Sequence, residues 1–115
     1  MSSTKTKTIL IVEDEGPMRQ VLADKFKHEH FKVFEAKNGK DGFDVALKER
    51  PDIILLDILL PKTNGMTMLR KVREENQWGK QVPIILLTNL TTDEKILKEI
   101  AENEPAYYLV KSDWK

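Results

Sequence analysis

The sequence predicts an α/β protein built on a five-stranded parallel sheet with helices on both faces. Strand-like and helix-like segments alternate along the 115 residues. Three of the strand-like segments are almost wholly aliphatic, which is typical of parallel strands buried on both faces. Several of these apolar segments also end in a polar side chain, as expected when a ligand binds at the carboxyl ends of parallel strands.

Five segments are expected to form the strands. The first, third and fourth contain the aliphatic runs 9–12, 53–56 and 84–87. A strand, a helix and a second strand in one sheet imply a right-handed crossover, so the strands should lie parallel. The expected strands span residues 8–13, 31–35, 52–57, 83–88 and 107–111.

Four helices are expected between these strands, because apolar residues recur there at steps of three and four. Pro17 suits the start of the first helix, and Thr91 or Thr92 can cap the fourth. The prolines Pro61, Pro83 and Pro105 fall between elements, where proline is tolerated. The residues expected to face inward are Met18, Val21, Leu22 and Phe26, then Gly42, Phe43, Val45 and Ala46, then Met66, Leu69 and Val72 after a start at Asn64 or Gly65, and finally Ile96, Leu97, Ile100 and Ala101.

Length and composition narrow the class of protein. A chain of 115 residues suggests one domain, residues 1–115. It has 19 basic and 19 acidic side chains and no cysteine, so we expect neither a nucleic-acid surface nor disulfide or thiol chemistry. The apolar run 9–12 is too short for a signal sequence or a membrane span. These features favour a cytoplasmic protein that binds neither nucleic acid nor membrane.

Polar side chains stand at the carboxyl ends of four expected strands. Glu13 and Asp14 follow the first, Asp57 ends the third, Thr88 ends the fourth and Lys111 ends the fifth. Three carboxylates on one rim would repel one another, and a hard cation such as Mg²⁺ resolves that repulsion. A carboxylate can also act as a nucleophile and form an aspartyl-phosphate, which we expect of Asp57. The Thr88 hydroxyl and the Lys111 ammonium can then stabilise the negative charge on the phosphoryl oxygens.

Each of these residues alone has an ordinary structural explanation as a solvated loop, a cap or a surface side chain. The prediction of a shared phosphoryl and metal site depends on their joint occurrence at equivalent positions of one sheet.

From about Thr8 to Lys115 the chain resembles the receiver domains of bacterial two-component response regulators. The similarity lies in residues 9–15 (ILIVEDE), 55–61 (LLDILLP) followed by Gly65, 86–88 (LLT) and 108–111 (YLVK). The resemblance implies a flavodoxin-like, CheY-like doubly wound sheet with the strand order 2-1-3-4-5. It also implies a phosphorelay protein that receives its phosphoryl group from a histidine kinase or a phosphotransfer protein and is not an enzyme for an external metabolite.

The resemblance assigns metal-binding roles to individual residues. Asp57 would be the phosphate acceptor, and Asp14 and Asp57 would bind Mg²⁺ directly. Glu13 would act on the metal largely through water, and the backbone carbonyl of Leu59 would be a further ligand.

The resemblance also implies a switch. Thr88 and Lys111 would bind the phosphoryl oxygens, and Tyr108 resembles the aromatic residue that turns inward when the threonine moves. The fourth helix and the fifth strand would form the docking face for partners.

The sequence departs from the family pattern near the site. Ser112 follows Lys111 where proline is common, and Asn89 stands where a small residue is common. Leu59 and Leu90 occupy positions from which a polar side chain could orient an attacking water, so we expect a long-lived phosphoryl group.

The chain ends four residues after Lys111, so the fifth helix expected from the family is largely missing. We therefore expect a receiver domain truncated at its last helix. An uncovered apolar face favours association, which suggests a homodimer or a domain-swapped dimer.

Three alternatives stay open on the sequence. A receiver-like interaction scaffold that does not use phosphate would keep the same fold. An aspartyl-phosphate phosphatase is weakly supported, because such enzymes usually need a second acid where this chain has Leu59. A flavin carrier is also weakly supported, because no glycine- and hydroxyl-rich phosphate loop follows the first strand.

His28 and His30 lack other metal ligands nearby and are expected at the surface.

Overall fold

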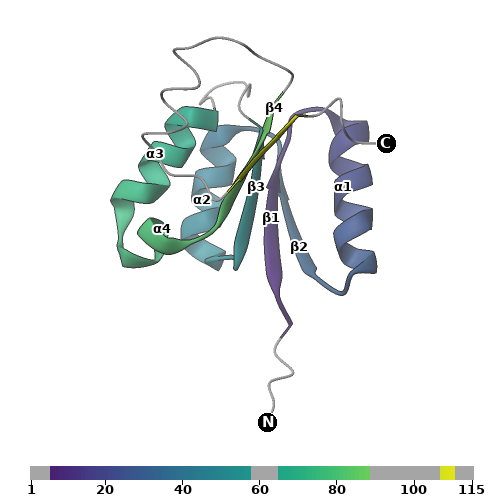
Figure 1. Ribbon diagram of the computed structural model, residues 1–115, viewed down its shortest axis with the longest axis horizontal. Coiled ribbons are helices and arrows are strands. Elements are labelled where there is room, and N and C mark those ends of the chain that lie inside the picture. The colour runs from purple at the N-terminus through teal and green to yellow at the C-terminus, as the bar shows by residue number, and fades with distance from the viewer. Residues whose placement is uncertain (1–5, 58–64, 89–106, 111–115) are drawn as a thin grey trace.

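The computed structural model describes residues 6–57, 65–88 and 107–110, which form a parallel sheet between two layers of helices (Figure 1). The strand order is β2-β1-β3-β4-β5, and every neighbouring pair is parallel. This confirms the predicted fold class and strand order. The elements are β1 (Thr8–Val12), α1 (Gly16–His28), β2 (Lys32–Ala36), α2 (Gly39–Glu49), β3 (Ile53–Asp57), α3 (Gly65–Glu75), α4 (Gln77–Gln81), β4 (Ile84–Thr88) and β5 (Tyr107–Val110).

The central strands are buried on both faces, as their continuous aliphatic sequences predict. Successive side chains of a strand point to opposite faces, so Leu10 and Val12 of β1 lie in one core cluster and Ile9 and Ile11 in the other. All four side chains are fully buried. Strand β2 lies at the edge of the sheet and is only partly buried.

Helix α1 covers one face of the sheet, and α2, α3 and α4 cover the other (Figure 1). The residues predicted to face inward from α2 and α3 are buried or partly buried. Among the described helices, none is both long and apolar enough to cross a bilayer. The inward residues confirmed by the structure are Met18, Leu22 and Phe26 of α1, Gly42, Phe43, Val45 and Ala46 of α2, and Met66, Leu69 and Val72 of α3.

The predicted apolar stripe of α1 was wrong at Val21, a residue that is 62% exposed. Successive residues of an α-helix are about 100° apart around its axis. The buried side of α1 runs from Leu22 toward Ala23, both fully buried. Val21 lies on the other side of Leu22 and therefore points toward solvent.

The short helix α4 was not predicted. Asn76 caps it by accepting a hydrogen bond from the Gly79 N–H at 2.8 Å, and Trp78 packs against the core beneath α3. The strand bounds differ from the predicted ones by one residue at some ends. The predicted helix around residues 91–101 lies outside the described residues.

Helix α1 ends in a left-handed turn at His30, whose φ is 71°. The Phe31 N–H donates to the Phe26 carbonyl at 2.9 Å and the His30 N–H donates to the Lys27 carbonyl at 3.0 Å. The rings of Phe26 and Phe31 pack edge to face, with their centroids 5.4 Å apart. These bonds and this apolar contact are those of a Schellman C-cap, in which glycine usually occupies the left-handed position.

Replacing His30 with glycine is expected to raise the free energy of unfolding by about 1 kcal/mol, because glycine relieves the crowding of a Cβ at positive φ. His28→Gly is the matched control. Both histidines are exposed, as predicted, but His28 is still helical, so glycine there should lower stability. Urea unfolding of both variants measures the difference. Two changes of the same sign would contradict this account of the turn.

Candidate functional site

The acidic pair Glu13-Asp14 follows directly after β1. The Glu13 N–H donates to the Ala36 carbonyl at 3.1 Å, which extends the β1–β2 ladder by one residue. The Glu13 side chain is fully buried, whereas Asp14 is exposed. One carboxylate of the pair is thus anchored within the protein and the other faces solvent.

Asp57 is the last residue of β3, the strand next to β1. Val12 is paired with Leu56, so Asp57 comes level with Glu13 at the carboxyl ends of the two strands. The chain runs from β1 to β2 on one side and from β3 to β4 on the other. Doubly wound sheets bind ligands at this switch point, at the carboxyl ends of the strands. Asp57 as a whole residue is only 3% exposed.

The structure brings Glu13, Asp14 and Asp57 together as predicted. One carboxylate oxygen from each lies within 4.8 Å of the other two. Two of these three acids are buried, and buried like charges at such a distance raise the free energy of the folded state unless they are compensated. A set of carboxylate oxygens open to solvent on one side fits a hard divalent cation that keeps part of its water shell, as Mg²⁺ does.

The remaining predicted residues are placed only in part. Thr88 is the last residue of β4, beside β3, and its main chain pairs with Val110. Tyr108 lies in β5 opposite Leu86. The structure does not describe the side chains of Thr88 and Tyr108. Leu59 and Lys111 lie outside the described residues, so their predicted roles stay predictions.

Two residues beside the acidic pair were not found from the sequence. Arg19 of α1 hydrogen-bonds to the main chain of Glu13, and Glu35 of β2 pairs with Arg19. One signal was present in the sequence. A cation near the amino end of a helix opposes the helix dipole, so an arginine there needs a nearby acceptor.

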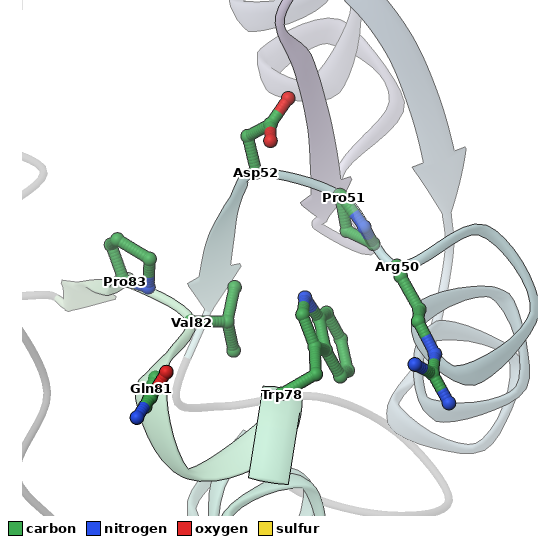
Figure 2. A pocket seen from close by; sticks show the side chains of 7 residues that line it. All are labelled: Arg50, Pro51, Asp52, Trp78, Gln81, Val82 and Pro83. Atoms are coloured by element: carbon green, nitrogen blue, oxygen red, sulfur yellow. The ribbon is translucent and has the colours of Figure 1, made fainter.

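A hollow of about 240 Å³ opens at the other end of the sheet, where β3 and β4 begin (Figure 2). The Val82 side chain points toward the Trp78 ring in this view. The carboxylate of Asp52 accepts hydrogen bonds from the N–H of Thr8 at 2.8 Å and from its hydroxyl at 3.2 Å. Asp52 therefore ties β1 to β3 and has no place in the acidic cluster.

Comparison with known proteins agrees with the geometry. The family model for the response regulator receiver domain matches residues 9–113. The chemotaxis protein CheY4 of Vibrio cholerae is 28% identical with a TM-score of 0.85, and the match covers 93% of this chain and 88% of that one. The beryllofluoride-activated N-terminal receiver domain of RstA from Klebsiella pneumoniae is 31% identical with a TM-score of 0.80, with 92% and 86% covered.

A third similar structure bears on the metal. The receiver domain of the sensor histidine kinase PA1611 from Pseudomonas aeruginosa, with a magnesium ion coordinated in its active-site cleft, is 27% identical with a TM-score of 0.82. The match covers 93% of this chain and 86% of that one. With the family match extending over nearly the whole sequence and the acidic cluster at the expected rim, the chain belongs to the response regulator receiver domain family.

Proposed function

We propose that this protein accepts a phosphoryl group on Asp57 from a histidine kinase or a phosphotransfer protein in a Mg²⁺-dependent reaction, and that phosphorylation changes its affinity for partners. The observation that carries the proposal is the convergence of Glu13, Asp14 and Asp57 from two neighbouring strand ends. Family membership supports the same function.

The chemistry assigned to Asp57 is nucleophilic. One of its carboxylate oxygens forms a bond to phosphorus, while the bond from phosphorus to the donor breaks and the donor group leaves with the electron pair. The donor would be a phosphorylated imidazole in the cell or acetyl phosphate in the test tube. Burial of Asp57 among strand ends fixes the direction of approach and limits the access of water.

We assign the metal to Asp14 and Asp57 as direct ligands and to Glu13 acting largely through water. The backbone carbonyl of Leu59 is proposed as a further ligand. When bound, Mg²⁺ would offset the negative charge of the carboxylates and that of one phosphoryl oxygen. The magnesium described for the PA1611 receiver domain supports this assignment.

Thr88 and Lys111 are proposed to bind the other phosphoryl oxygens, with Thr88 and Tyr108 forming the switch. Ligands shift populations between existing conformations in proportion to their differential affinity. A phosphoryl group that draws Thr88 toward it would favour the conformation with Tyr108 turned inward. The placement of Thr88 on the strand beside β3 and of Tyr108 on the adjoining strand supports a connection between the two residues.

The proposal also covers the extent of the domain, its class of activity, its location and its self-association. We treat residues 1–115 as one receiver domain that acts as a signalling module and turns over no external metabolite. We also propose a cytoplasmic location and self-association as a means of regulation.

Metal addition and removal test the proposal. A ligand in tenfold excess over its Kd raises the free energy of unfolding by about 1.4 kcal/mol, and Mg²⁺ should do this at constant ionic strength. Beryllofluoride, which resembles a phosphoryl group bound to a carboxylate, should stabilise the protein further only when Mg²⁺ is present. EDTA should reverse both effects.

Thermal unfolding measures the stability changes, and fluorine NMR detects bound beryllofluoride. Asp14→Asn should weaken both responses. A wild-type protein that responds to neither addition would be a receiver-like interaction scaffold, and the proposal would be wrong.

A further inference from the structure

We propose that Arg19 is a positioning residue for the metal site. Its guanidinium holds the main chain of the acidic pair in the shape that binds Mg²⁺, and Glu35 holds the guanidinium in place. The inference rests on the proposed function, because it concerns the affinity of the acidic cluster for Mg²⁺.

Arg19 bridges two elements with two different nitrogen atoms. Its Nη1 donates to the carbonyl oxygen of Glu13 at 2.8 Å, and its Nε lies 3.3 Å from Oε1 of Glu35. The side chains of Arg19 and Glu35 are 18% and 36% exposed, whereas those of the surface pair Lys40–Asp44 are 67% and 61% exposed. The bridge is therefore less exposed to solvent than the Lys40–Asp44 pair, mainly at Arg19.

The carbonyl that Arg19 holds belongs to the peptide that joins Glu13 to Asp14. The N–H of Glu13 is already bonded to the Ala36 carbonyl, and Oε2 of Glu13 accepts the Glu15 N–H at 3.1 Å. With Arg19 on the carbonyl as well, both main-chain polar groups of Glu13 are held, and the peptide that leads to Asp14 is oriented through its carbonyl. That orientation sets the direction of the Asp14 side chain, which is exposed and gains little from packing.

Positioning matters here because the three carboxylates repel one another when no cation is bound. A loop free to relax would move Asp14 away, and each binding event would have to bring it back. Residues that orient the ligands of a metal typically change its affinity by about 10- to 100-fold when removed. Loss of the Arg19 contact should therefore weaken Mg²⁺ binding.

A cation close to a cation site also acts in the opposite direction, because its charge disfavours the binding of the metal. The carboxylate of Glu35 offsets the charge of Arg19, which reduces this effect. The two explanations predict opposite changes in the affinity for Mg²⁺. Removing the charge would tighten Mg²⁺ binding if repulsion were dominant, and would weaken it if geometry were dominant.

The test compares Arg19→Lys, Arg19→Gln and Glu35→Gln by Mg²⁺ titration calorimetry at constant ionic strength. We expect the Kd for Mg²⁺ to rise about tenfold in both Arg19 variants, because a lysine ammonium lacks the planar fork that reaches both partners. Glu35→Gln should cause a smaller rise, since an amide oxygen still accepts a hydrogen bond from Arg19. This mild variant keeps the test decisive even where Arg19→Gln unfolds.

Phosphorylation kinetics supply a second readout. The Mg²⁺ concentration that gives half the maximal rate with acetyl phosphate should rise in the Arg19 variants. The rate at saturating Mg²⁺ should stay within about twofold of wild type, because the variants leave the nucleophile unchanged and the metal restores the geometry. A residue with a merely structural role would not separate these two quantities.

Arg73→Lys is the matched control. Nη1 of Arg73 donates to the carbonyls of Gly79 at 2.9 Å and Val82 at 2.7 Å, so Arg73 also holds main-chain oxygens, but those of α4 and the turn that follows it. Its lysine variant should lose stability with an unchanged Kd for Mg²⁺.

If the Arg19 variants lose stability while binding Mg²⁺ as wild type does, or if Arg19→Gln binds it more tightly, the positioning role is wrong and the proposed function stands. If the wild-type protein binds no Mg²⁺, both proposals are wrong.

Discussion

Asparagine in place of Asp57 is expected to abolish phosphoryl transfer to this protein while leaving its fold intact. The two side chains have nearly the same shape, and the position is only 3% exposed, so a change in size would have disturbed the strand ends. The amide lacks the anionic oxygen that attacks phosphorus. Intact-mass spectrometry after treatment with acetyl phosphate and Mg²⁺ should show one added phosphoryl group on the wild type and none on the variant.

Two further Asp→Asn changes make this result specific. Asp44→Asn alters an exposed carboxylate that pairs with Lys40 on α2, and phosphorylation should proceed as in wild type. Asp14→Asn removes a proposed ligand and keeps the nucleophile, so the reaction should be slower and should recover as Mg²⁺ is raised. A phosphoryl group found on Asp57→Asn would show that another carboxylate is the acceptor and would contradict the assignment.

The fold was predictable because the signals that define it are local and repeated. Runs such as 9–12 and 84–87 have no polar face, and only a strand covered on both sides accommodates them in a short α/β chain. The order of the strands is a different matter. The fact that β1 lies between β2 and β3 depends on packing between distant segments, and it came from resemblance to a known family.

The acidic cluster was predictable for the same reason. Glu13 and Asp14 come after the aliphatic run 9–12 and Asp57 comes after the run 53–56, so a parallel sheet brings all three to one rim. Arg19 was not predictable in this way, because its role depends on where α1 passes over the end of β1 and on a carboxylate supplied by β2. Such contacts involve three elements and leave no periodic pattern in the sequence.

Two errors in the helices have related physical causes. Val21 fits a three- and four-residue pattern with Met18 and Leu22, yet the buried arc of α1 extends from Met18 and Leu22 toward Ala23, away from Val21. Helix α4 has five residues, which is too short to show a period. Its formation depends on the Asn76 cap and on packing against α3, and tertiary contacts of this kind routinely determine short helices.

The close packing of α4 against α3 predicts a second large effect, on the stability of the protein. Replacing Gly79 with alanine is expected to lower the free energy of unfolding by about 3–4 kcal/mol. A Cβ at Gly79 would overlap the main-chain carbonyl oxygen of Val72 in α3. Retreat of α4 is also restricted, because the Gly79 carbonyl accepts a hydrogen bond from Arg73 of α3. Relieving the overlap by moving α4 away therefore means lengthening or breaking this bond.

Alanine at two other glycines supplies a graded comparison in urea unfolding. A Cβ at Gly16 has no neighbouring atom within 4 Å, so Gly16→Ala should be neutral or stabilise α1 by about 0.5 kcal/mol. A Cβ at Gly42 would lie 2.9 Å from Cγ2 of Val12 and 3.0 Å from the flexible Met68 Sδ, which suggests a loss of about 1–2 kcal/mol. Equal stability of Gly79→Ala and Gly16→Ala would mean that α4 does not pack on α3 as closely as described. Since α4 lies where β4 begins and the acidic cluster lies where strands end, the folded fraction of Gly79→Ala should still bind Mg²⁺ with wild-type affinity.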